Sequence, residues 1–149
     1  MTIAIRLLAD LPQLIEPVAR LRWLEWHDEH HLDHWMEVTR REAGRDELPV
    51  TWVAVDAAGS GVGAVGLGAH DVEERPELTP WVWGLVVRAD MRDRGVGRML
   101  LSRLERFAVG RGHSEIWVST GPPAVAFYER CGWRSVEQIG PSTILRKPI

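Results

Sequence analysis

Two glycines and several arginines stand close together in the stretch VVRADMRDRGVGRMLL. Gly95 and Gly97 lack β-carbons, so a ligand can approach the backbone closely at these positions. Arg92, Arg94 and Arg98 add positive charge around the same point. If a helix begins near Gly95, its unpaired N–H groups and the positive end of its dipole face the same space. These residue types at this spacing suit an anionic ligand such as a phosphate.

Two common glycine-rich nucleotide motifs do not match this stretch. A dinucleotide fingerprint requires a third glycine where this chain has Leu100, and it opens a βαβ unit. A Walker loop requires a Gly-Lys-Ser or Gly-Lys-Thr triplet, which the sequence does not contain. From the glycines alone, a strand-to-helix turn with solvated arginines explains the pattern equally well.

Periodicity predicts the elements on both sides of the glycines. Residues 81–87, WVWGLVV, form an apolar run typical of a strand, and a glycine inside a strand, here Gly84, often marks a bulge. Apolar side chains then recur at helical spacing from residue 97 to residue 108. The sequence therefore predicts a strand, a glycine junction and an amphipathic helix whose N-terminus lies near Gly95.

Residues 92–97, RDRGVG, resemble the acyl-CoA signature of the GNAT superfamily of acyl-CoA-dependent N-acyltransferases, Arg/Gln-x-x-Gly-x-Gly/Ala, which lies between the fourth strand and the third helix. Residues 126–133, AFYERCGW, resemble the family's Phe-Tyr-Glu-x-x-Gly-Phe segment at the expected distance downstream. The order of elements resembles the family over essentially the whole chain. Two motifs in register with this topology are much more specific than one.

The resemblance implies a binding site for acetyl-CoA as co-substrate, with no metal. Backbone N–H groups of the signature loop would hold the pyrophosphate, and the fourth strand would pair with the pantetheine arm and stabilise the oxyanion. The acyl-CoA-binding residues expected from it are Leu85, Val86, Val87, Arg92, Asp93, Arg94, Gly95, Val96, Gly97, Arg98, Thr120 and Phe127.

Tyr128 is the residue expected to transfer a proton as a general acid. A thiol has a pKa of about 8.5 and a tyrosine hydroxyl one of about 10, so an aligned tyrosine can protonate the departing thiolate. Direct attack of the amine in a ternary complex needs no nucleophile from the enzyme, so Cys131 is not expected to act as one. The alternative for Tyr128 is a core tyrosine with a hydrogen-bonded hydroxyl.

Two positions depart from the family pattern. Many members carry an asparagine that contacts the cofactor where this chain has Gly121. Many also use an acidic residue on the fourth strand as the base, and WVWGLVV contains none. The second departure keeps open a function from another class, a non-catalytic acyl-CoA-binding or sensing module.

Candidates for the base and for the lining of the acceptor site lie in two stretches. After the third expected strand come His70, Asp71 and the glutamates of VEERPELTP. The resemblance places the stretch WHDEHHLDHW over the acceptor site. The candidate lining and base residues are Trp26, His27, His31, His70 and Glu77. On one continuous helix the histidines of this stretch would share a face that suits a transition metal, but substrate lining and a solvated helix end are both favoured over metal binding.

Acidic side chains surround the expected acceptor mouth and would steer a cationic amine toward it. They are Glu25, Asp28, Glu29, Asp33, Glu73, Glu74 and Glu77. Aromatic walls would come from Trp23, Trp26, Trp35, Trp81 and Trp83. We therefore expect the acceptor to be a primary amine of a small, preferably cationic molecule or of a peptide.

The length and composition of the chain indicate its fold class, its location and the partners to expect. The 149 residues predict one mixed α/β domain, 1–149, whose mostly antiparallel sheet splays between strands four and five and is flanked by about four helices. A net charge of −3 argues against nucleic acid as a partner, including an aminoacyl-tRNA. With one cysteine and no signal peptide or membrane segment in MTIAIRLLADLP, we expect a cytoplasmic protein without a membrane partner, and a homodimer as in many family members.

Overall fold

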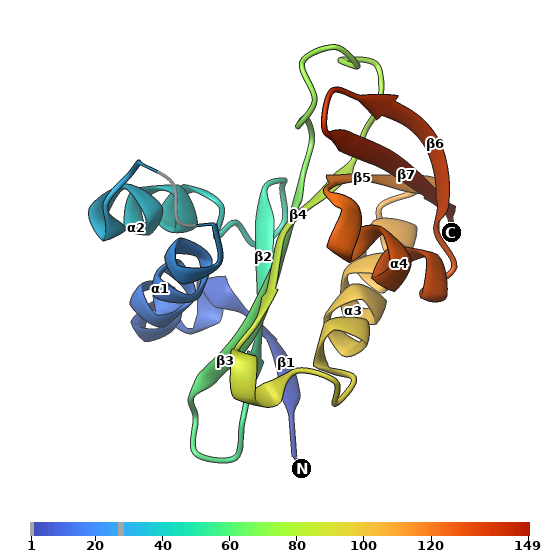
Figure 1. The fold of residues 1–149 in the computed structure, drawn as a ribbon. Helices are drawn as coiled ribbons and strands as arrows, with labels where there is room; N and C mark the ends of the chain where they lie inside the picture. Colours follow the sequence, from blue (N-terminus) through green and yellow to red (C-terminus); the bar gives the residue numbers. More distant parts are fainter. Residues whose placement is uncertain (1, 27–28) are drawn as a thin grey trace.

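The computed structural model describes residues 2–26 and 29–149, and in it helices cover both faces of a central sheet (Figure 1). The strands in these residues are β1 (Ala4–Leu7), β2 (Val50–Val55), β3 (Gly61–Gly68), β4 (Trp81–Val87), β5 (Glu115–Thr120), β6 (Arg134–Ile139) and β7 (Ser142–Pro148). The α-helices are α1 (Ile15–Trp26), α2 (Leu32–Arg41), α3 (Val96–Gly110) and α4 (Pro122–Arg130). Short 3-10 turns span Leu8–Asp10, Pro12–Leu14 and Ala89–Met91.

The strands of the described residues form one sheet in the order β1-β2-β3-β4-β5-β7-β6. Within it only β4 and β5 run parallel, and the other neighbours are antiparallel. The parallel pairing is limited to Trp81 with Trp117 and Val82 with Val118. From the third residue of β4 onward the two strands diverge (Figure 1). The predicted splay between the fourth and fifth strands is therefore confirmed.

A β-bulge lies on β4 immediately after the last pair with β5. In the register with β3, Trp83 faces Gly66 and Val86 faces Ala64, so β3 supplies one residue between these pairs while β4 supplies two. The first of the two is Gly84, whose φ of +62° is a left-handed value that favours glycine. The bulge predicted at Gly84 is confirmed, and it lies where β4 leaves β5.

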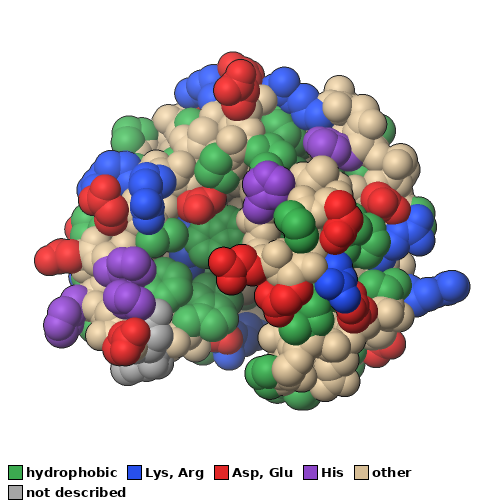
Figure 2. Space-filling model, turned by 90° about the horizontal axis from the view of Figure 1, so that it is seen from above, with side chains coloured by type: hydrophobic (Ala, Val, Ile, Leu, Met, Phe, Trp, Pro, Cys, Tyr) green, Lys and Arg blue, Asp and Glu red, His purple; other side chains and the backbone are tan. Residues whose placement is uncertain are grey.

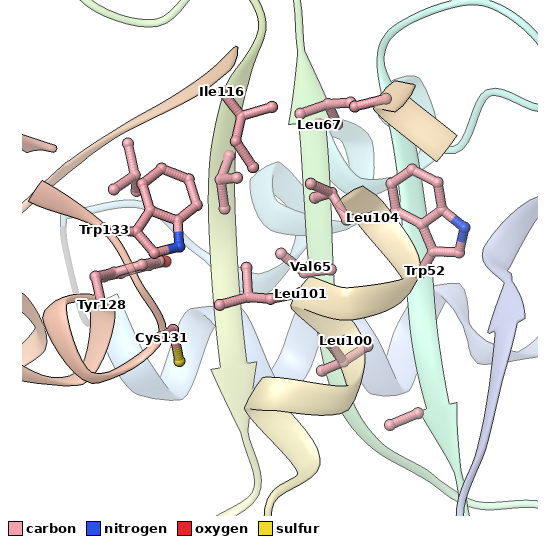
Figure 3. Packing of buried hydrophobic residues seen from close by; sticks show 14 of the residues in the cluster. Trp52, Val65, Leu67, Leu100, Leu101, Leu104, Ile116, Tyr128, Cys131 and Trp133 are labelled. Carbon is pink, nitrogen blue, oxygen red and sulfur yellow. The ribbon is translucent and has the colours of Figure 1, made fainter. Parts of the chain in front are cut away.

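Helices α1 and α2 lie on one side of β1–β4, and α3 and α4 lie on the other side (Figure 1). Figure 3 shows Leu100, Leu101 and Leu104 of α3 between Trp52 on one side and Tyr128 on the other. These residues belong to the larger core cluster, on the α3 side of the sheet. A separate core cluster lies around α1 and contains Leu8, Leu14, Val18, Val53, Ala64 and Val86. Strand β4 therefore has a packed helix layer against each of its faces.

The boundaries expected around the glycine junction match the structure. The strand expected at residues 81–87 has those bounds, and the helix expected near Gly95 begins at Val96. A 3-10 turn at Pro12–Leu14 directly precedes α1. Helix α2 ends at Arg41, and after it the N–H of Gly44 donates to the carbonyl of Pro49 at 3.0 Å. None of the helices in residues 2–26 and 29–149 has both the length and the apolar character needed to cross a membrane.

Candidate functional site

The junction expected to bind an anion lies between the end of β4 and the start of α3 (Figure 1). Asp93 and Gly95 both have left-handed φ values, +60° and +81°, and Gly95 is the N-cap of α3. The N–H of Met99 donates to the carbonyl of Gly95 at 3.0 Å, so the N–H groups of the residues between them stand at the open end of the helix. A β-carbon on Gly95 would meet no atom within 4 Å. The junction therefore presents unpaired N–H groups to open space.

Gly97 brings three elements together at this junction. A β-carbon at Gly97 would lie 3.2 Å from Cζ of Phe127 in α4 and 3.9 Å from Cγ2 of Val87 in β4. The glycine thus permits close packing of α3, α4 and the end of β4 around the splay. The structure brings together these three predicted site residues, which are far apart in the sequence.

The three arginines of the signature have different surroundings. Arg92 donates from Nε to the carbonyl of Val87 at 3.0 Å and pairs through Nη2 with Glu25 of α1 at 2.9 Å. Arg98 donates from Nη2 to the carbonyl of Arg130 at 3.4 Å. Arg94 is exposed, and the described part of the chain offers its guanidinium no ion-pair partner within 4 Å. Arg94 is therefore the signature arginine most available to an incoming anion.

Tyr128 lies in α4 on the side of the sheet that carries α3, and it is only 4% exposed. Its ring meets those of Phe127 and Trp133 edge-on, with centroid distances of 5.4 and 5.3 Å (Figure 3). Burial raises the pKa of its hydroxyl well above the usual value, and the Cys131 thiol adds to this shift. Like any tyrosine, Tyr128 is protonated at neutral pH, and burial makes its hydroxyl a weaker acid than that of a free tyrosine.

The remaining expected cofactor residues line the diverging strands. Leu85 and Val87 pack toward the α3 side of β4, whereas Val86 packs toward α1. Thr120 ends β5 and pairs with Thr143 of β7. Gly121, at the position of the family's asparagine, is the extended N-cap of α4.

The expected acceptor residues lie mainly at the surface. Trp26 is 41% exposed and stacks on Trp35 with a centroid distance of 6.1 Å. His31 is exposed and forms the N-cap of α2, where its carbonyl accepts the N–H of His34 at 3.0 Å. His27 lies outside the described residues.

The continuous helix needed for a histidine metal face is not present. Helix α1 ends at Trp26 and α2 begins at Leu32, and residues 29–31 before α2 are not helical. The rings of His30 and His34 instead stack at 3.9 Å. Across residues 2–26 and 29–149, no group of three or more His, Cys, Asp or Glu side chains has a metal-binding arrangement.

The loop between β3 and β4 carries the other candidates. His70 and Glu77 are exposed on it. The loop is tied to β6 by a bidentate ion pair of Arg75 with Glu137. Trp81 is fully buried against Trp117 and therefore cannot form an aromatic wall of an acceptor site. Figure 2 views the molecule from the end that carries the β3–β4 loop. It shows acidic and histidine side chains around a hydrophobic hollow.

Arg22 is a site residue that the sequence analysis did not identify. It is fully buried, its Cζ lies 4.3 Å above the ring of Trp83, and its Nη1 donates to Thr39 Oγ1 at 3.2 Å. Burial lowers its pKa to about 10, and the Glu42 carboxylate opposes this shift. Its position in the sequence is consistent with burial, because Arg22 follows the core residue Val18 by one helical turn and so lies on the same helix face.

Gly84→Ala is expected to destabilise the protein by about 1–3 kcal/mol, because alanine disfavours a positive φ and its β-carbon would lie 3.1 Å from Arg22 Nε. Thermal unfolding measures the change. Gly59→Ala is the matched control, since Gly59 also has a positive φ but no atom within 4 Å of a β-carbon. Equal losses in the two variants would show that the contact with Arg22 contributes nothing.

Comparison with known proteins agrees with this geometry. No curated protein sequence matches the chain. Aminoglycoside 6'-N-acetyltransferase complexed with coenzyme A matches with a TM-score of 0.81 and 18% identity over 99% of this chain and 97% of that chain. PaiA N-acetyltransferase from Thermoplasma acidophilum, in complex with coenzyme A, matches with a TM-score of 0.68 and 17% identity over 100% of each chain. Arabidopsis thaliana NAA60 with a bisubstrate analogue matches with a TM-score of 0.72 and 18% identity over 99% and 98%.

At these identities the solved structures establish the fold, which is the one expected from the two motifs. The model of the acetyltransferase (GNAT) family matches residues 15–133, most of the chain. This range includes the glycine junction and Tyr128. The chain therefore belongs to the GNAT family of acetyltransferases and is an acyltransferase.

Proposed function

We propose that the protein transfers the acetyl group of acetyl-CoA to a primary amine of a small cationic acceptor. The observation that carries the proposal is the convergence of the open N-terminus of α3, the end of β4 and Phe127 beside Tyr128. The open N-terminus of α3 suits a pyrophosphate, and Tyr128 would supply a proton donor near the point where β4 and β5 diverge. Residues 92–97 would hold the pyrophosphate, with Arg94 free to pair with it.

The arrangement supports direct transfer in a ternary complex. Bound acetyl-CoA supplies the activated acyl group as a thioester. The backbone of Leu85 and Val87, beyond the last pair with β5, has hydrogen-bonding groups for the pantetheine arm and for the oxyanion. The amine nitrogen attacks the thioester carbon, a C–N bond forms and the C–S bond breaks. Tyr128 gives its hydroxyl proton to the departing sulfur.

Surface charge supports a cationic acceptor. Exposed acidic side chains lie just before α2, in α2 and in the β3–β4 loop: Glu29, Asp33, Glu73, Glu74 and Glu77. The stacked pair of Trp26 and Trp35 adds aromatic surface that attracts a cation. One structural neighbour is an aminoglycoside 6'-N-acetyltransferase, whose acceptor is an amine-bearing small molecule.

Acetyl-CoA turnover with a panel of polyamines, aminoglycosides and amino acids tests the proposal. Thiol release detects the reaction, and the mass of the acceptor identifies the product. We expect at least one cationic amine to be acetylated in preference to the anionic ones. Preference for an anionic amine would contradict the charge argument. Acetyl-CoA binding without transfer to any amine would favour a non-catalytic acyl-CoA-binding module.

A further inference from the structure

The face of the β4 bulge that points away from α3 is covered by Arg22 of α1. A β-carbon on Gly84 would lie 3.1 Å from Nε and 3.2 Å from Nη2 of this arginine. Within the described chain, neither of these nitrogens has a hydrogen-bond partner. A fully buried cation with two unpaired donors requires a compensating anion nearby. The anion whose charge acts on Arg22 is the Glu42 carboxylate.

Glu42 follows the last residue of α2 and is anchored beside the sheet. Its carbonyl accepts a hydrogen bond from Thr51 Oγ1 of β2 at 2.9 Å. Thr51 pairs with Gly66 of β3, and Gly66 pairs with Trp83 of β4. This row of strand neighbours ends at the residue directly before the bulge. Glu42 is half-buried, whereas Arg22 is fully buried, so of the two only Glu42 has contact with solvent.

We propose that Glu42 accepts the proton of the acceptor ammonium group, and that Arg22 is a positioning residue whose buried charge attracts the Glu42 carboxylate toward the bulge without a hydrogen bond or ion pair between them. The inference rests on the acetyl transfer proposed above and supplies a base that β4 does not carry. The side chains of WVWGLVV contain no acid, so a side-chain base, as opposed to a chain of waters, would come from a neighbouring element.

A Glu42 carboxylate oxygen takes one N–H proton from the ammonium ion, and the freed lone pair attacks the thioester carbon. As the C–N bond forms and the C–S bond breaks, Tyr128 protonates the sulfur. The proton that nitrogen loses as it becomes an amide restores the Tyr128 hydroxyl. Glu42 releases its proton to solvent, so one proton is released for each acetyl group transferred.

Charged groups from three elements face Glu42. Burial raises its pKa above the usual value, Arg22 of α1 and Arg41 of α2 lower it, and Asp71 after β3 raises it further. The net shift is upward, so Glu42 is a stronger proton acceptor than an exposed glutamate. It acts as a base only where it is ionised, so activity must fall as the pH drops through its raised pKa.

The pH dependence of kcat/KM in Glu42→Gln tests the inference, with the best amine of the panel as acceptor. Near neutral pH we expect a loss of about tenfold to a hundredfold. The loss should shrink as the pH approaches the pKa of the free amine, because the amine then arrives neutral. Glu42→Asp, which keeps a carboxylate, should recover part of the activity. Acetyl-CoA affinity should be unchanged.

Controls separate this role from a structural one. Glu37→Gln removes an exposed carboxylate of α2, the helix that Glu42 follows, and should leave kcat/KM unchanged. A loss in Glu42→Gln that is the same at every pH, or no loss, would overturn the inference. So would the pH-dependent loss appearing in Asp71→Asn instead. If the unaltered protein transfers no acetyl group, the proposed function is wrong. If it transfers acetyl groups but the Glu42 variants lack the expected pH-dependent loss, only the role of Glu42 is wrong.

Discussion

Tyr128→Phe is expected to lower turnover by about a hundredfold while leaving acetyl-CoA affinity nearly unchanged. The substitution removes one hydroxyl and keeps the ring, so its edge-on contacts with Phe127 and Trp133 remain. Steady-state kinetics gives the turnover, and calorimetric titration gives the affinity. Unchanged turnover would remove the general-acid role, and a large loss of thermal stability would indicate a structural hydroxyl instead.

The ionisation of Tyr128 can be measured directly, because it is the single tyrosine of the chain. Burial disfavours the phenolate, so the pKa lies above that of free tyrosine. Tyrosinate absorbance should therefore be nearly absent at about pH 10, where free tyrosine is half ionised. The hydroxyl would then remain a proton donor over the whole working range, and no loss of activity below this pH should follow its titration.

Arg94→Glu is expected to weaken acetyl-CoA binding by about tenfold to a hundredfold. A hydrogen bond to a charged group contributes about 1.5–3 kcal/mol, and the reversed charge also repels the pyrophosphate. Arg94 has no competing ion-pair partner in the described chain, so its full charge acts on the ligand. Affinity is measured by titration at two salt concentrations.

Arg134→Glu is the matched control for this prediction. Arg134 is exposed at the start of β6 and lies outside the glycine junction, and the change in net charge is the same. If both variants weaken binding equally, the effect is one of overall charge. If neither does, the helix start is not the pyrophosphate site.

Local sequence patterns were sufficient to predict the elements that we propose hold the cofactor. The apolar run of β4, its glycine bulge and the periodic helix after Gly95 depend on residues close in sequence. The shared histidine face that one continuous helix would give is also absent for a local reason, because α1 ends at Trp26 and α2 begins only at Leu32.

The acceptor side depends on packing between distant segments, which periodicity does not reveal. Arg22 reaches the bulge only because α1 lies over β4. Glu42 comes beside it because α2 ends next to Thr51 of β2. Trp81 was expected at the surface, and its burial follows from the pairing of β4 with β5. Such contacts between α1, α2 and β4 define the part of the site that sequence alone left open.

A crystal structure of the protein with coenzyme A is the most direct test of the central claim. We expect the pyrophosphate to lie against the N–H groups of residues 94–97, the pantetheine arm between β4 and β5, and the sulfur beside the hydroxyl of Tyr128. Coenzyme A bound away from the start of α3, or with its sulfur remote from Tyr128, would contradict the account.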